Sequence, residues 1–160
     1  IFNLSSKEKR SMTRTVIVKG GEARYVQDIS VGHHLFQADE PFDVGGRDAG
    51  PNPFELLLAA LGTCTSITVR MYADRKGWPL EDIQVRLAYA TVQAEDCDTH
   101  NNEAEFVDGI QEELIVLGDL SEAQRRRLAE IASKCPVHRT LGSPISICTR
   151  LATQADDRNS

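Results

Sequence analysis

The chain has 160 residues and a net charge of −6, with 24 acidic residues against 18 Lys and Arg. This balance argues against nucleic-acid binding and against anionic membrane surfaces, because both depend on basic side chains that neutralise phosphates. The longest uninterrupted apolar run, Leu56–Leu61, is far shorter than the roughly 20 residues of a membrane-spanning helix. We therefore expect a soluble protein.

The four cysteines are too few for a disulfide scaffold, and no secretory signal pattern opens the sequence. We expect a cytoplasmic protein whose thiols are free, metal-bound or redox-active. The polar, unpatterned residues 1–11 are predicted to be a tag or disordered extension, and residues 12–160 a single domain.

The N-terminal part of the domain alternates apolar and polar residues in three segments separated by glycines. This pattern predicts an antiparallel β-meander over Arg14–Gly20, Arg24–Ser30 and His34–Asp39. A loop rich in Gly and Pro, residues 40–53, follows. It leads into a helix from Pro53 to about Lys76, with Asn52 as N-cap and Glu55 three residues after it.

The C-terminal part predicts a hairpin, an amphipathic helix capped by Ser121, a short turn or helix over "PVHRTLG", and a last strand. The fold class is therefore α+β with the order βββαββαβ. The hairpin strands are Asp82–Gln93 and Phe106–Gly118, and the last strand is Pro144–Ala152.

The four thiols differ in their surroundings. Cys97 lies in an acidic loop that disfavours the thiolate, and Cys148 is interpreted as a small buried or half-buried filler of the last strand. Cys64 shares a helical face, interpreted as facing the core, with residues at offsets of three, four and seven: Leu57, Ala60, Leu61, Thr68 and Met71. Cys135 precedes Pro136 as the N-cap of a short helix, with His138 one turn on, which is an activating environment.

One thiol in an apolar pocket and one at a helix N-cap suggest a peroxide-reducing pair. A thiolate attacks the O–O bond and becomes a sulfenic acid, and a second thiol condenses with it to a disulfide. Because apolar surroundings oppose the thiolate, a cation is expected near Cys64, and the candidates are Arg24, Arg47, His138 and Arg139.

Together, "GPNPFELLLAALGTCTS", "KCPVHRTLG" and "HHLFQADEP" resemble the osmotically inducible protein C and organic hydroperoxide resistance (OsmC/Ohr) family. The resemblance implies an OsmC-like fold with two sheets around a long central helix, in an intertwined homodimer. It also implies a peroxiredoxin-like thiol peroxidase for organic hydroperoxides, serving oxidative stress defence. Cys64 matches the peroxidatic position and Cys135 the resolving one, and we expect a dithiol reductant and no cofactor.

The sequence departs from the Ohr branch of the family at two positions. Phe54 directly follows Asn52-Pro53, where that branch has a Glu, and Glu55 is interpreted as a helix-capping residue instead. Arg24 matches the family's meander Arg only approximately. The chain thus resembles a broader OsmC-like branch.

Two other readings stay open. One is a Cys-His hydrolase with Cys64 as nucleophile and His138 as base. The other is a non-catalytic dimeric module for ligand binding or redox sensing, in which the cysteine pair reacts slowly. No metal site is expected, because neither CxxC nor HxxxH spacing occurs and His33 and His34 are adjacent.

Overall fold

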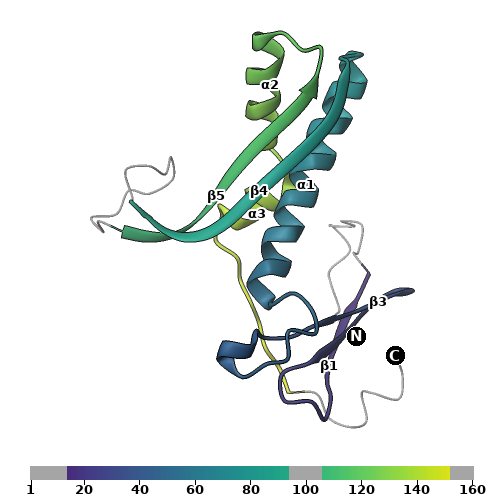
Figure 1. The fold of residues 1–160 in the computed structure, drawn as a ribbon, viewed down its shortest axis with the longest axis vertical. Coiled ribbons are helices and arrows are strands. Elements are labelled where there is room, and N and C mark those ends of the chain that lie inside the picture. Colours follow the sequence, from purple (N-terminus) through teal and green to yellow (C-terminus); the bar gives the residue numbers. More distant parts are fainter. Residues whose placement is uncertain (1–13, 94–105, 152–160) are drawn as a thin grey trace. The chain divides into compact units, whose positions relative to one another are not determined.

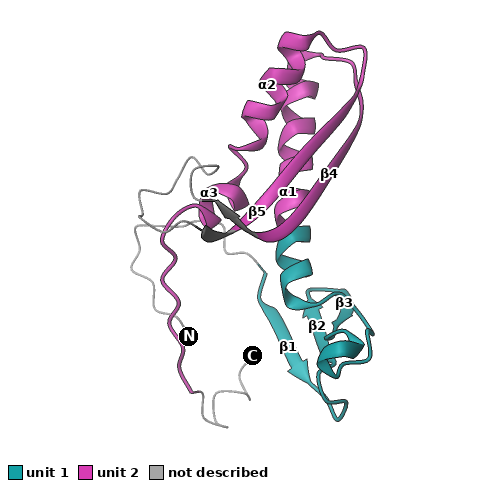
Figure 2. Ribbon diagram, turned by 60° about the vertical axis from the view of Figure 1, so that its left-hand side comes forward, with its two compact units in different colours: residues 1–59 teal, residues 60–160 magenta. Residues whose placement is uncertain are grey.

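The computed structural model describes residues 14–93 and 106–151 and confirms an α+β fold (Figure 1). The predicted extension, residues 1–11, and the loop with Cys97 lie outside the described residues. The chain divides into two compact units, residues 1–59 and 60–160, and the boundary falls within the long helix α1, Pro53–Lys76 (Figure 2).

A three-stranded antiparallel sheet forms the first unit, in the order β1 (Val16–Gly20), β2 (Gln27–Val31) and β3 (His34–Ala38). The predicted meander is confirmed, with its middle strand beginning three residues later than expected. Gly32 makes the β2–β3 turn at a φ of +63°, a conformation that suits glycine. In the centre of the sheet, Ile29 lies opposite Val18 and Phe36.

The loop after β3 is organised by the carboxylate of Asp39, which is only 2% exposed. Asp39 Oδ1 accepts the backbone N–H of Glu40 at 2.8 Å, and Oδ2 accepts those of Arg47 at 2.8 Å and Ala49 at 3.3 Å. Gly46 packs directly on Glu40, where a Cβ would lie 1.7 Å from the carbonyl oxygen. The loop is therefore held by backbone N–H groups that donate to the Asp39 carboxylate.

Helix α1 begins and ends as its sequence predicts. The backbone N–H of Glu55 donates to Asn52 Oδ1 at 2.9 Å, and the N–H of Asn52 donates to Glu55 Oε2 at 2.7 Å, which is a reciprocal capping box. At the other end Gly77 has a φ of +63°, and the N–H of Trp78 donates to the Ala73 carbonyl at 3.0 Å. This is a glycine-terminated helix end.

Length and composition alone would allow α1 to cross a bilayer, and it is the one such helix in the described part of the chain. The uninterrupted apolar run Leu56–Leu61 does not indicate this, because the apolar character of α1 is spread over a longer stretch that includes polar residues. Core helices of water-soluble proteins meet the same criterion, so it is weak evidence for a membrane span. Only 22% of the most apolar stretch is buried within the chain, which leaves much apolar surface on α1.

The second unit contains a long antiparallel hairpin, β4 (Leu80–Gln93) and β5 (Phe106–Gly118). Its strands run along α1 in both views (Figures 1 and 2). Gly62 marks a close approach between helix and hairpin, because a Cβ at this position would lie 2.6 Å from Leu87 Cδ1. The hairpin therefore packs on the Gly62 side of α1.

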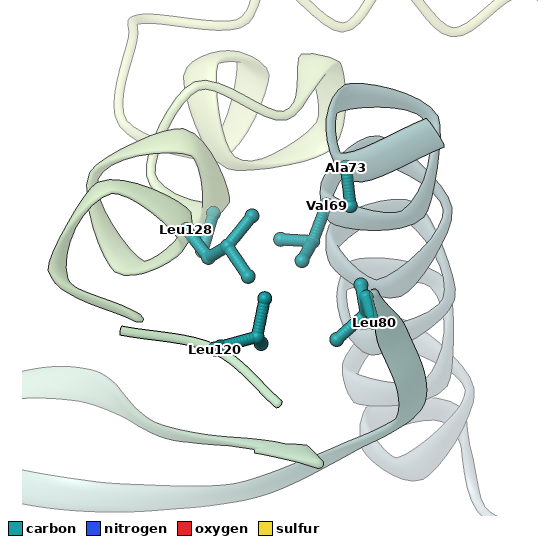
Figure 3. Packing of buried hydrophobic residues seen from close by; sticks show 6 residues of the cluster. Val69, Ala73, Leu80, Leu120 and Leu128 are labelled. Carbon is teal, nitrogen blue, oxygen red and sulfur yellow. The ribbon is translucent and has the colours of Figure 1, made fainter. Parts of the chain in front are cut away.

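A compact apolar cluster joins α1 to α2 (Glu122–Ala132). Figure 3 shows Leu128 of α2 pointing toward Val69 of α1, with Leu80 and Leu120 beside them. Val69 and Leu128 are fully buried. The capping box between Ser121 and Gln124 starts α2 as predicted. This cluster holds α2 against α1.

The last strand predicted by sequence, Pro144–Ala152, does not form over the described residues 144–151. No described strand of either sheet pairs with this segment. Its apolar side chains are exposed, with 55% for Ile145, 85% for Ile147 and 97% for Leu151. The alternating pattern is that of a strand, but a strand also needs a partner edge for its backbone hydrogen bonds.

Asp39 generates a prediction about acid stability. Burial raises its pKa, but the three backbone N–H groups and the charge of Arg47 outweigh burial and lower it below the ordinary value of 3.8. A lowered folded-state pKa contributes stability above the unfolded pKa, and this is lost as pH falls through the folded-state pKa. We expect Asp39→Asn to lower the melting temperature at pH 7. On acidification, the melting temperature of this variant should fall by less than that of the native protein.

Thermal melts at pH 7 and at about pH 3 test this, since an unfolded Asp titrates near 4. The control is Asp43→Asn, an exposed acidic residue of the same loop. Equal melting behaviour of Asp39→Asn and Asp43→Asn would contradict the prediction.

Candidate functional site

Cys135 is the N-cap of α3 (Pro136–Leu141), as the sequence predicts. Its Sγ accepts the backbone N–H of His138 at 3.2 Å, and the residue is fully buried. Two hydrogen bonds turn the chain from α2 into this position: Lys134 N–H to the Ile131 carbonyl, and Cys135 N–H to the Ala132 carbonyl. The thiol is therefore held by the helix that it caps.

Cys64 is half-buried on α1, in the part of the helix that belongs to the second unit. The Cys135 thiol and the backbone N–H of Val137 lie near enough to perturb this thiol, and the Thr68 hydroxyl donates to the Cys64 carbonyl at 2.7 Å. Burial is the main cause that raises the pKa of the Cys64 thiol, and Cys135 raises it further. Val137 and Thr68 act in the opposite direction by hydrogen bonding. The two thiols, 71 positions apart in the sequence and both in the free form, thus lie near one another, and the Cys135 Sγ accepts the hydroxyl of Thr65, the residue next to Cys64.

Thr65 is a third member of this cluster, and our sequence reasoning missed it. It is fully buried, and its hydroxyl donates to Cys135 Sγ at 3.6 Å. The available signal was its spacing, because Leu61, Thr65 and Val69 follow one another at intervals of four on the buried face. A hydroxyl in such a stripe needs a partner, and here that partner is a thiol.

The buried face of α1 differs from the face that the sequence analysis predicted to face the core. The buried residues of α1 are Leu61, Gly62, Thr65, Val69 and Ala73. Leu57 is 36% exposed and Met71 58%, so neither lies in the core of this chain, and Cys64 sits at the margin of the buried face. Because α1 is apolar on more than one side, its sequence did not determine which side the hairpin covers.

The cations proposed to stabilise the Cys64 thiolate are divided between the two units. Arg24 and Arg47 belong to the first unit, where the guanidinium of Arg24 lies 4.9 Å from the centre of the Tyr25 ring and Arg47 donates its backbone N–H to Asp39. His138 is in α3 and bonds Cys135 through its backbone N–H. Among the interactions that perturb the Cys64 thiol, the ones favouring the thiolate come from neutral donors of the second unit.

The remaining predicted residues are placed as follows. Glu55 caps α1 as interpreted, and Phe54 is 56% exposed. Cys148 is exposed in the C-terminal segment, so its interpretation as a strand filler was wrong, for the same reason that the strand itself does not form. Cys97 lies outside the described residues.

Comparison with known structures shows the same fold. An OsmC-like protein from Mycoplasma pneumoniae aligns with 18% identity and a TM-score of 0.64, covering 82% of this chain and 88% of its own. An organic hydroperoxide resistance protein OsmC from Legionella pneumophila aligns with 21% identity and a TM-score of 0.56, covering 79% and 88%.

An organic hydroperoxide resistance protein from Elizabethkingia anophelis, with thiocyanate bound, aligns with 16% identity and a TM-score of 0.59, covering 83% of this chain and 90% of its own. No curated protein matches the sequence. The family model of OsmC-like proteins matches residues 45–150, which include both cysteines of the cluster. The chain belongs to the family of OsmC-like proteins.

Proposed function

We propose that the protein is a thiol peroxidase that reduces organic hydroperoxides through Cys64, with Cys135 as the resolving residue. The observation that carries the proposal is that Cys135 packs on α1 beside Cys64: its Sγ accepts the hydroxyl of the adjacent Thr65 at 3.6 Å, and its thiol perturbs that of Cys64. A half-buried thiol against a fully buried one is the arrangement that a sulfenic acid intermediate needs to be closed as a disulfide.

The reaction begins at Cys64. Its thiolate attacks one oxygen of the hydroperoxide, the S–O bond forms, and the O–O bond breaks to release the alcohol after it takes up a proton. The Cys135 sulfur then attacks the Cys64 sulfenic acid, the S–S bond forms, and hydroxide leaves as water after protonation. A dithiol reductant returns both cysteines to thiols by exchange.

The names of two aligned structures support this chemistry, since both are called organic hydroperoxide resistance proteins. The geometry also favours it over the Cys-His hydrolase. The group that His138 is seen to offer the cluster is its backbone N–H, which donates to Cys135 Sγ. A hydrolase would need the imidazole of His138 as its base.

The first prediction from the proposed function concerns the two cysteines. Cys64→Ser should abolish cumene hydroperoxide consumption, because no peroxidatic sulfur remains. Cys135→Ser should form the Cys64 sulfenic acid after one equivalent of oxidant but no disulfide within the chain. Peroxide assays and intact-mass peptide mapping measure both results.

Cys148→Ser is the matched control, since Cys148 is an exposed thiol outside the cluster. It should retain native activity. Full activity of Cys64→Ser would end the proposal. Stoichiometric oxidation without turnover in the presence of a dithiol would instead indicate the redox-sensing module.

The second prediction concerns substrate preference. Apolar side chains flank Cys64 one and two turns along α1, where Ile67 is 54% and Met71 58% exposed. Each buried CH₂ contributes about 0.8 kcal/mol, so a four-carbon difference contributes ~3 kcal/mol, or roughly a hundredfold in kcat/KM. We expect tert-butyl hydroperoxide, which carries four carbons, to be preferred to hydrogen peroxide by about this factor. Equal specificity constants would contradict the apolar approach to the thiol.

We also propose that the protein is a homodimer. Helix α1 is about 36 Å long at about 1.5 Å per residue, and much of its apolar surface is uncovered in the single chain. The C-terminal segment presents Ile145 and Ile147 in a strand pattern without a described partner strand. A second copy offers both an apolar surface and an open strand edge.

The third prediction follows from that segment. Light scattering at micromolar concentration should give twice the 17.7 kDa mass of the chain. Ile147→Asp should weaken the dimer, because a carboxylate would be buried in the new interface. The control is Ser146→Asp, the neighbouring exposed position on the other side of an extended segment. A monomeric native mass, or equal effects of the two variants, would refute the proposal.

A further inference from the structure

We propose that Thr65 is a positioning residue for the resolving step: its buried hydroxyl holds the Cys135 sulfur, as the thiolate, for attack on the Cys64 sulfenic acid. This inference rests on the proposed peroxidase function. It assigns a role to a residue that is neither of the two reacting thiols.

The placement of Thr65 supports a specific contact with the thiol. Thr65 and Asp39 are the two polar residues in the buried class among residues 14–90 and 109–151, whose side chains the structure describes. A helical Thr hydroxyl commonly bonds the carbonyl four residues earlier, and Thr68 does so with Cys64 at 2.7 Å. The Thr65 hydroxyl instead donates to a sulfur 70 positions away in the sequence, at 3.6 Å. A buried hydroxyl is costly unless it has such a partner.

Cys135 Sγ thus accepts two donors, the Thr65 hydroxyl and the backbone N–H of His138. Hydrogen bonds donated to a sulfur stabilise its thiolate relative to its thiol. They also restrict the rotation of the Cys135 side chain. Because the attacking species in disulfide formation is the thiolate, both effects accelerate closure of the pair.

The same contact acts in the reverse direction, during reduction. Cys135 is fully buried whereas Cys64 is half-buried, so an external dithiol reaches the Cys64 sulfur. A new S–S bond forms between the reductant and Cys64, and the Cys64–Cys135 bond breaks with the electron pair on Cys135. The departing thiolate is received by the Thr65 hydroxyl and the His138 N–H. The second thiol of the reductant then releases Cys64.

Matched substitutions on α1 test the role of Thr65. Thr65→Val removes the hydroxyl at nearly constant volume, and Thr65→Ser keeps it. Thr63→Val makes the same change at an exposed position two residues earlier. Each purified protein is mixed with one equivalent of cumene hydroperoxide, and sulfenic acid and disulfide are followed by quenched intact-mass analysis over a range of pH.

We expect Thr65→Val to form the sulfenic acid at the native rate and the disulfide roughly tenfold more slowly, as the loss of one hydrogen bond to a charged group predicts. The pH midpoint of disulfide formation should rise by about one unit. Thr65→Ser should restore both quantities, and Thr63→Val should match the native protein. A purely packing role would not move the pH midpoint.

A titration that needs no peroxide separates this proposal from the proposed function. In a chain with the substitutions Cys64→Ser, Cys97→Ser and Cys148→Ser, the ultraviolet absorbance of the thiolate reports Cys135 alone. Thr65→Val in this chain should raise the titration midpoint of Cys135. If the Thr65→Val chain folds poorly, Thr65→Ala takes its place and should raise the midpoint as well. An unchanged midpoint together with an unchanged disulfide rate overturns the role of Thr65. A native protein that forms no Cys64–Cys135 disulfide overturns the proposed function and the resolving role with it.

Discussion

The packing of α2 on α1 is the interaction on which the site depends. Leu128 meets Val69 in a core that leaves both side chains without solvent exposure. This contact holds α2 against α1, and the chain then turns within three residues of Ala132 to place Cys135 at the N-cap of α3. The two thiols meet because the helices that carry them share one core.

The site stabilises sulfur with neutral donors of its own unit. Val137 and His138 offer backbone N–H groups, and Thr65 offers its hydroxyl. Such donors cost less to bury than an unpaired cation, and their directions are determined by helix geometry. Burial nevertheless raises the pKa of Cys64, so the reactivity of this thiol depends on how well the donors compensate for lost solvation.

In the first unit, backbone N–H groups likewise stabilise a buried acceptor, the carboxylate of Asp39. Asp39 collects three backbone N–H groups and so closes a loop that contains few apolar side chains able to pack it. The carboxylate stabilises the segment that leads into α1, where Asn52 and Glu55 cap the helix. In both units, side-chain acceptors and backbone donors determine where the loops end and the helices begin.

Much of this protein was predictable from local sequence. The ends of α1, the N-cap of α2 at Ser121 and that of α3 at Cys135 follow from hydrogen bonds between residues close in the chain. The hairpin strands and the meander follow from apolar alternation between turn residues. Both candidate thiols could be identified because their surroundings, an apolar helix and a helix N-cap, are themselves local patterns.

Tertiary structure alone decided the rest. The sequence of α1 is apolar on several sides, so only the hairpin at Gly62 and Leu128 on Val69 selected the buried face and left Met71 exposed. The strand pattern after Pro144 lacks a partner edge within the described chain. The role of Thr65 depends on a sulfur 70 positions away. Local hydrogen bonds determine where elements begin and end, whereas the neighbours of a face, an edge or a buried hydroxyl come from distant parts of the chain.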